Sequence, residues 1–406
     1  MKVPLTSLVL ALLPWAAFGC EAPAARRDAS TARDSAGVRI VENLRGTWTT
    51  PWQVDAEPTL SIGSVNGSPD HLLYQVIGAV GLPGGRIVIA NEGSLELLFY
   101  DEDGNLLHRV GGRGGGPGEF QSLEWLSRHG PDSVLAVDVW NQRVSYFDAD
   151  GNFGRSVRLE PNAEIPFPRP VGVFGDGSLL ATQGTFSLGG DPPVRVERTL
   201  HPLFRYESDG RTAILLGSFP GPEWVIAPVG PVGQWERRRR PFGSETAFAA
   251  AGDRFYVGDN ATYEIRAYSA TGRLIQVMRR AAIPITLEQA DIQAFEDSAL
   301  AVGDARRRRQ MRVLFDNLPA PPRTYPAYAP DIQVDGDLNV WVRESSRAGD
   351  QLSEWSVFSA AGLLLGTVVM RPGIDVLDIG ADYVLGLQRD ELGVEYVRKF
   401  RLRRDR

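Results

Sequence analysis

The 406-residue sequence predicts an all-β protein: a six-bladed β-propeller closed by an N-terminal strand, with a helical insertion between blades four and five. Three observations lead to this prediction. A unit of short apolar strands recurs along the chain, tight glycine turns separate the strands, and the last unit stops one strand short while a spare strand stands near the N-terminus. Repeats of four short antiparallel strands, with a period of about 40–50 residues, are typical of propeller blades.

The two clearest copies of the unit are residues 86–105 and residues 133–152, which align without a gap. Each holds an apolar strand, a polar turn, a strand that ends in an aromatic residue, and an Asp-x-Asp-Gly-Asn turn. Glycine at Gly104 and Gly151 accepts the positive φ that such a turn requires. Weaker copies follow at residues 203–219, 263–278, 355–370 and 374–402, which gives six blades.

The sixth copy ends after three strands because the chain ends there. Residues 59–63 resemble the fourth strand of the first blade, residues 107–111. We therefore expect them to complete blade six, which would leave no unpaired sheet edge in the ring. Residues 38–42 have the composition of a further strand, which we expect at the same place.

A glycine-rich turn at residues 112–120 is followed by the pattern Asp138-x-x-Asn141-x-Arg143. This combination resembles the NHL repeat, and the whole chain is similar to TolB-like six-bladed propellers, which bacteria export, often as lipoproteins. The resemblance implies the fold and not a ligand. A phosphate-binding loop would need Gly-Lys-Ser/Thr opening a helix, whereas Glu119 and Phe120 lead into a strand.

The N-terminus predicts export. Met1 and Lys2 precede an apolar run at residues 8–18, so residues 1–20 are interpreted as a signal peptide. Residues 17–20 resemble a bacterial lipobox, in which Cys20 is lipidated, although that motif usually has Leu at position 17 and a small residue at position 18. Ordinary cleavage with an incidental cysteine is the alternative. Residues 21–37 are predicted to be a flexible tether, and residues 38–406 the propeller.

The long insertions predict which end of the ring is functional. In a four-stranded meander, the A–B and C–D turns lie at one end of the blade, and the B–C turns and D–A crossovers at the other. The insertions at residues 184–194, 221–243, 284–326 and 345–352 all belong to the second group. Loops elaborated on one rim of a rigid scaffold usually bind ligands, so this rim is the predicted functional face. Loop drift without function is the alternative.

The longest insertion, residues 284–326, is predicted to contain helix. Thr286 and Gln289 have the spacing of a capping box, and apolar residues recur at residues 287–300 and 311–315. The helical segment is expected either as a partial lid over the channel or as an ornament on the rim.

The candidate binding residues are aromatic and arginine side chains, most of them in one insertion. They are Trp224, Trp235, Arg237, Arg238, Arg239, Arg240, Arg113 and Trp140. Local packing is the alternative for the tryptophans. Solvated loops and a solvated tail are the alternative for the arginine clusters at residues 237–240, 306–309 and 398–406.

No catalytic or metal-binding residue is assigned. The four histidines lack metal-ligand spacing, Gly-x-Ser-x-Gly is absent, and the only cysteine belongs to the signal. No cofactor is expected, although a carboxylate-only Ca²⁺ site in the channel stays open. The net charge of −7 argues against nucleic acid.

The sequence therefore predicts a cell-envelope binding or scaffolding propeller. It would be a lipoprotein on the periplasmic or outer side of a membrane, and its lipid anchor would be its only contact with that membrane. It would recognise an envelope protein or a small ligand on the loop-rich rim. The alternative is a metal-dependent lactonase- or lyase-like enzyme, so enzymatic activity stays open.

Overall fold

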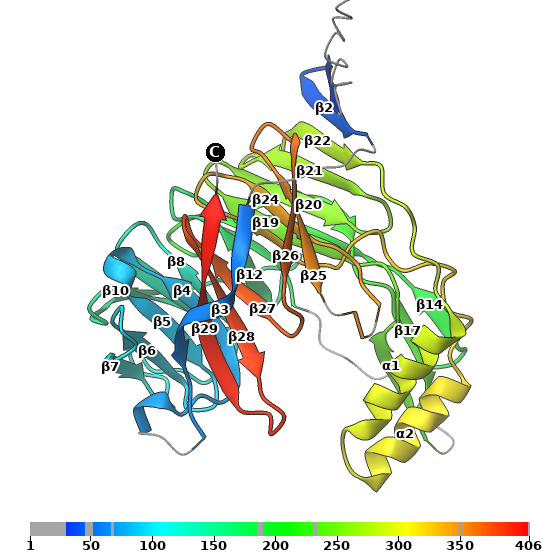
Figure 1. The fold of residues 1–406 in the computed structure, drawn as a ribbon, viewed down its shortest axis with the longest axis horizontal. Helices are drawn as coiled ribbons and strands as arrows, with labels where there is room; N and C mark the ends of the chain where they lie inside the picture. Colours follow the sequence, from blue (N-terminus) through cyan, green and yellow to red (C-terminus); the bar gives the residue numbers. More distant parts are fainter. Residues whose placement is uncertain are drawn as a thin grey trace, which may run out of the picture.

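The structure is a computed structural model that describes residues 30–44, 52–65, 69–184, 190–230, 234–347, 349–350 and 352–404. Six antiparallel sheets stand around a common axis, as predicted (Figure 1). The predicted signal peptide, with Cys20, lies outside the described residues. None of the helices in the described part of the chain is both long and apolar enough to cross a bilayer.

Each blade is a four-stranded meander, numbered here from the inner strand A to the outer strand D. Blade one contains β4 (Val76–Gly81), β5 (Ile87–Asn91), β6 (Glu96–Tyr100) and β7 (Leu106–Gly111). Blade two contains β8 (Trp125–Arg128), β9 (Ser133–Asp138), β10 (Arg143–Asp148) and β11 (Phe153–Arg158). Blade three contains β12 (Pro168–Val173), β13 (Leu179–Gln183), β15 (Leu200–Tyr206) and β16 (Ala213–Pro220).

The other three blades follow the same order. Blade four contains β19 (Thr246–Ala251), β20 (Arg254–Asp259), β21 (Glu264–Ser269) and β22 (Leu274–Arg280). Blade five contains β23 (Ile332–Val334), β24 (Val340–Arg343), β25 (Ser353–Phe358) and β26 (Leu364–Met370). Blade six contains β27 (Asp375–Ile379), β28 (Tyr383–Arg389), β29 (Glu395–Arg404) and the N-terminal strand β3 (Trp52–Ile62). Short 3₁₀ turns lie at Pro69–His71 and Pro83–Gly85.

The ring closes as the sequence predicts. β3 pairs antiparallel with β29, from Ile62 opposite Val397 to Trp52 opposite Arg404. An apolar cluster lies at each of the six interfaces between blades, and Ile62 belongs to the one between blades six and one. A single twisted sheet cannot bury both faces, so each blade depends on its neighbours for its core.

The glycine turns contribute to this packing. Gly104, with φ +85°, lies so close to β3 that an added Cβ would be 3.0 Å from Leu60. Gly151 in the next blade, with φ +78°, lies in the same way against Val110 in the outer strand of blade one. β3 therefore occupies the place of an ordinary outer strand.

The prediction that residues 38–42 join blade six is wrong. β2 (Val38–Asn43) pairs in parallel with β22, which adds it to the outer edge of blade four. The cause is non-local: Asn43 is buried and bonds to the carbonyls of Arg279 and Gly362 and to the Leu364 N–H. These contacts span more than 200 residues, so no local pattern could indicate them.

The tether prediction needs a related correction. Of residues 21–37, only those from Ser30 onward are described, and there β1 (Ser30–Ser35) forms a hairpin with β2. Ser30 pairs with Asn43 and Ser35 with Val38, so residues 30–35 pair along their length with β2, the strand that is attached to blade four.

The insertions contain regular structure. β14 (Arg195–Glu197), β17 (Trp224–Pro228) and β18 (Trp235–Arg239) form a small sheet, so residues 221–243, expected only as a crossover, contain a hairpin. α1 (Gln289–Ala301) and α2 (Ala305–Asp316) lie between blades four and five. The predicted capping pair is displaced: Asp291 accepts from the Glu288 N–H at 2.8 Å, and Thr286 instead bridges to Thr324.

Candidate binding rim and channel mouth

The long insertions pack into one unit, which we call the insertion body and define as β14, β17, β18, α1 and α2. β14 comes from the B–C loop of blade three, β17 and β18 from the crossover to blade four, and the helices from the crossover to blade five. Val225 and Ala227 in β17 share an apolar cluster with Met311 and Leu314 in α2. Loops distant in sequence therefore share one core.

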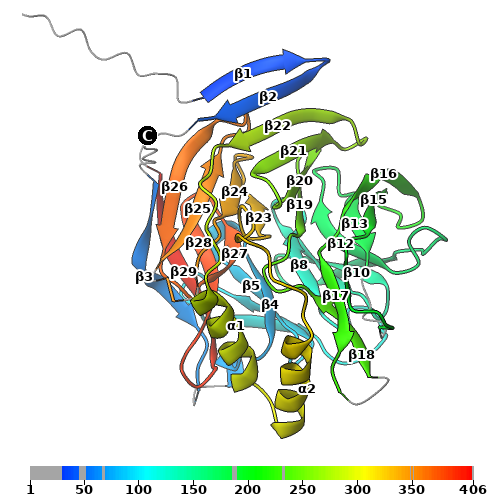
Figure 2. The same cartoon turned by 90° about the vertical axis from the view of Figure 1, so that its right-hand side faces the viewer.

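The fourth insertion joins the same unit. Arg347, in the B–C loop of blade five, pairs with Asp291, lies 3.0 Å from Glu288, and donates to the Thr286 carbonyl at 2.8 Å. Figure 1 and Figure 2 place the helices and the β1–β2 hairpin at opposite edges of the molecule. The insertion body therefore lies on the side of the molecule opposite the β1–β2 hairpin.

The predicted arginine cluster lies in β18 and its exit, and each member has a glutamate partner. Arg237 Nε lies 2.7 Å from Glu197, Arg238 lies 2.5 Å from Glu236, Arg239 pairs with Glu245, and Arg240 lies 2.8 Å from Glu223. Arg237 and Arg239 also lie over the ring of Trp224, at 4.3 and 5.4 Å from its centroid. Arg237, Arg238 and Arg240 therefore pair within the small sheet and the crossover that carries it, and Arg239 joins the sheet to Glu245 at the start of blade four.

The two tryptophans of this insertion are not equally accessible. Trp224 is buried, with 7% of its surface exposed, whereas Trp235 at the start of β18 is half-buried. Local packing, the alternative considered for these residues, accounts for the contacts of Trp224.

The predicted cluster at residues 306–309 has different surroundings. Arg306, Arg307 and Arg309, with Arg312, are exposed on α2, and none forms an ion pair within the part of the chain that the structure describes. The apolar side of α2 is buried against β17. An overall acidic protein thus presents a basic helix face at the edge of the insertion body.

The channel opens toward the insertion body between blades two, three and four. A cavity of about 340 Å³ there is lined by Glu124, Arg169, His201, Arg239 and Glu245, with Trp125 and Phe248 on its walls. Arg169 lies 3.0 Å from Glu124, and Arg239 pairs with Glu245. Successive side chains of a strand point to opposite faces of the sheet. Arg239 therefore lies on the face of β18 toward the channel, and Arg238, opposite Val225, lies on the face toward the helices. The helices therefore border the rim and do not cover the channel directly.

The pKa of His201 is shifted by its surroundings at this opening. Burial, and then the neighbouring cations Arg237 and Arg239, lower the pKa of His201 below its ordinary value. A neutral imidazole is therefore favoured at the channel mouth near pH 7. The opening combines charged groups of both signs with two aromatic walls, an arrangement typical of ligand sites.

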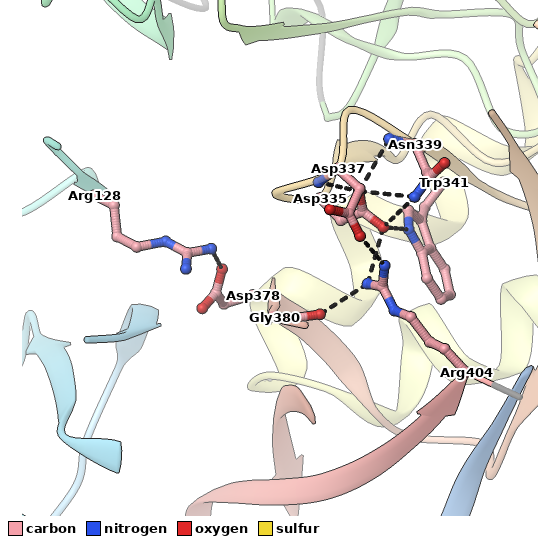
Figure 3. Close-up of polar contacts among 8 residues, drawn as sticks. All are labelled: Arg128, Asp335, Asp337, Asn339, Trp341, Asp378, Gly380 and Arg404. Carbon is pink, nitrogen blue, oxygen red and sulfur yellow. Dashed lines mark hydrogen bonds and ion pairs between the residues drawn. The ribbon is translucent and has the colours of Figure 1, made fainter. Parts of the chain in front are cut away.

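The channel continues to the opposite rim, where a cavity of about 700 Å³ shares Trp125, Val171 and Phe248 with the mouth. Arg128 in blade two reaches Asp378 in blade six at 2.6 Å (Figure 3). Asp378 also accepts from the Gly81 N–H and the Tyr383 hydroxyl. Burial of Asp378 raises the pKa of its carboxyl despite the neighbouring Arg128. The Arg128–Asp378 pair links blades two and six across the channel lining.

The glycine-rich turn with Arg113 is held by the motif residues that follow it. Asp138, fully buried, accepts from the Gln121 N–H, the Ser122 hydroxyl and Asn141, and Arg143 donates to the Gly115 carbonyl. The motif therefore fixes a crossover. Arg113 is exposed on this turn, and Trp140 is 71% exposed in the adjacent B–C turn.

Sequence reasoning missed Glu124, Arg169 and Glu245. All three stand where an inner strand begins at the insertion rim, just before or within β8, β12 and β19. A charged residue at the start of an otherwise apolar inner strand is the signal that could have identified them. Among the described residues, no group of three or more His, Cys, Asp or Glu side chains could hold a metal ion.

Comparison with known proteins agrees with the fold. Residues 68–165 match the family DUF5128, described as a 6-bladed beta-propeller. No curated protein matches the chain. A member of the DUF4221 family from Bacteroides vulgatus has 10% identity and a TM-score of 0.50, covering 87% of this chain and 99% of that one.

Two further solved structures are similar at low identity. A protein from Bacteroides fragilis that carries the description exported protein has 11% identity and a TM-score of 0.47, over 90% of this chain and 100% of its own. A gluconolactonase from Xanthomonas campestris has 13% identity and a TM-score of 0.41, over 88% and 98%. At these identities the similarity concerns the fold alone.

Proposed function

We propose that this chain is an exported, lipid-anchored binding propeller of the cell envelope, and that it recognises an acidic protein partner through the insertion body. The observation that carries the proposal is the interlocking of four insertions, from blades three, four and five, into one unit on one rim. Drifting loops would have no reason to share a core. A rigid scaffold that displays elaborated loops on one side is typical of binding proteins.

The charge of α2 supports the choice of partner. Four exposed arginines, Arg306, Arg307, Arg309 and Arg312, face solvent from a helix whose apolar side is already buried. Arginine forms bidentate bonds with carboxylates, and basic surfaces steer acidic partners toward themselves. An acidic protein surface is therefore the expected partner.

The N-terminal end of the chain supports export and anchoring. A signal-like segment ends in the lipobox-like Cys20, and the first described strand begins at Ser30, at the edge opposite the helices. A lipid on Cys20 would leave the insertion body directed away from the anchoring membrane. This orientation would present α2 to partners in the surrounding space.

The test is site-specific photo-crosslinking in the native host from Gln293, an exposed position on α1, the helix next to α2. We expect a discrete adduct with an acidic envelope protein. Replacing the four α2 arginines with glutamine should reduce that adduct at least about tenfold, since each rim charge contributes mainly through the association rate.

A second quadruple variant provides the matched control. Arg39, Arg211, Arg273 and Arg401 are exposed elsewhere, so changing them to glutamine alters the net charge equally and leaves α2 intact. The adduct should persist in this variant. Equal adducts from both quadruple variants, or no adduct from the wild type, would refute the proposal. For anchoring, a Cys20→Ala variant that still fractionates with membranes would exclude lipid attachment as the cause.

A further inference from the structure

A third cavity, of about 550 Å³, opens on the insertion rim between blades four and five. It shares no lining residue with the two channel cavities. Its walls are the B–C turn of blade four, the start of the B–C loop of blade five, and the two chain segments that lead to and from the helices. Those two segments are paired: Tyr325 N–H donates to the Ile285 carbonyl and Leu287 N–H to the Arg323 carbonyl.

A buried polar network forms one wall of this cavity. Glu344 Oε1 accepts hydrogen bonds from the Tyr263 hydroxyl at 2.5 Å, from Arg280 Nη1 and from the Ser356 hydroxyl. Ser356 is fully buried, and burial raises the pKa of Tyr263. Tyr263 therefore keeps its proton and donates, and three donors, from the B–C turn of blade four, from β22 and from β25, hold the carboxylate in one orientation.

Glu344 and Arg280, the two charged residues of this network, also have polar atoms that take no part in it and can face the cavity. Among the described residues, no donor reaches Glu344 Oε2, and no acceptor reaches Nη2 or Nε of Arg280. Glu344 and Arg280 both line the cavity, with only 17% and 21% of their side chains exposed. A fixed acceptor and a fixed donor thus stand side by side at the edge of a sheltered space.

We propose that this cavity binds a neutral polyhydroxylated ligand, that is, a carbohydrate. One hydroxyl would donate to Glu344 Oε2, and the adjacent hydroxyl would accept from Arg280. The site is independent of the protein-docking surface on α2 and adds a small-molecule function to it.

The charge balance selects this class of ligand. Arg280 and Glu344 neutralise each other, so an anion would be repelled by Glu344 and a cation by Arg280. A vicinal diol satisfies both groups, because each hydroxyl is a donor and an acceptor. Ile283, Pro284, Ile285 and Pro326 line the remaining wall and offer apolar surface to the C–H faces of a sugar ring.

The experiment uses the purified full-length chain and defined probes. Glucose, mannose and N-acetylglucosamine represent neutral sugars, citrate represents an anion, and spermidine represents a cation; saturation-transfer NMR detects binding and calorimetry measures it. We expect at least one neutral sugar to bind, and citrate and spermidine not to bind at this site. Glu344→Gln, which keeps the shape and removes the charge, should weaken sugar binding at least tenfold.

Two further variants keep the test decisive. Ala281 lines the cavity with an exposed side chain, so Ala281→Phe should fill the space and abolish sugar binding while the fold remains. Glu354→Gln makes the same chemical change at an exposed position in β25 and should bind like the wild type. The proposal is overturned if no neutral sugar binds, if Ala281→Phe and Glu344→Gln bind as tightly as the wild type, or if only citrate or spermidine binds.

Discussion

Arg404, the last residue of β29, places Nη2 2.9 Å from the carboxylate of Asp335, whose side chain is fully buried in the A–B turn of blade five (Figure 3). Asp335 also accepts from Asn339 and from the indole N–H of Trp341. Arg404 in turn lies over the ring of Trp52, 4.6 Å from its centroid, in the strand that closes the ring. The C-terminus, the N-terminal strand and blade five therefore meet at one ion pair.

Removing this arginine should be costly. In Arg404→Ala the buried Asp335 carboxylate loses its counter-charge, so we expect the free energy of unfolding to fall by about 3–5 kcal/mol. Asp337 also pairs with Arg404 at 2.9 Å, but its side chain is 75% exposed, so Asp337→Asn should change stability by less than about 0.5 kcal/mol. Denaturant unfolding of both variants checks this, and equal losses would contradict it.

The pKa of His201 should depend on Arg239. Because burial and two arginines lower this pKa, Arg239→Gln should raise it toward its ordinary value, measured by NMR titration of the imidazole. The lowered pKa also makes the stability of the folded protein depend on pH. As pH falls through about 6.5, the unfolded chain takes up a proton before the folded protein does, so the folded state loses stability on acidification.

A variant isolates that contribution. His201→Gln cannot titrate, so the wild type should lose stability relative to this variant as the pH drops from about 8 to 5. Unfolding free energies at several pH values provide the measurement. A difference between the two proteins that does not change with pH would show that His201 titrates alike in both states.

Asn43 should be a stabilising link between blades four and five. Its buried amide makes three hydrogen bonds to backbone groups of the two blades, so Asn43→Ala should cost more than about 2 kcal/mol. Glu42, its neighbour, makes exposed contacts with Arg279 at 3.2 Å and with Arg33 at 3.9 Å. Glu42→Gln should melt within a degree or two of the wild type, and thermal unfolding of the two variants compares them directly.

Asp138 should be the critical residue of the glycine-rich crossover. Asp138→Ala leaves the Gln121 and Asn141 N–H groups without their buried acceptor, and we expect a loss above about 3 kcal/mol. Asp132, exposed in the A–B turn of the same blade, provides the control Asp132→Ala, which should be nearly neutral. Comparable melting temperatures for the two variants would mean that the motif does not hold the turn.

Much of the ring could be predicted from sequence because each blade carries its own local signal. The Asp-Gly-Asn turns ending at Asn105 and Asn152 require glycine because the backbone there has a positive φ, and a strand stands on either side of each turn. Closure by β3 could also be predicted, since a missing strand and a spare strand must pair to remove an edge.

The site was harder to predict because its contacts are non-local. The ion pairs of the β18 arginines join residues as far apart as Arg237 and Glu197, and the channel-mouth cavity gathers side chains from three blades. The clustered arginines could be found in the sequence, but their glutamate partners could not be assigned. The Glu344 network joins a turn, the start of a loop and two strands that are distant in the sequence, and no spacing rule connects them.

The pairing of β3 with β29 also determines when the protein can finish folding. Residues 52–62 are synthesised more than 300 residues before their partners at 395–404. Until then, blade six lacks both β29 and the strand β3 that pairs with it, and the edge of β28 is open to other chains. A chain interrupted before β29 would therefore be prone to aggregate through this open edge.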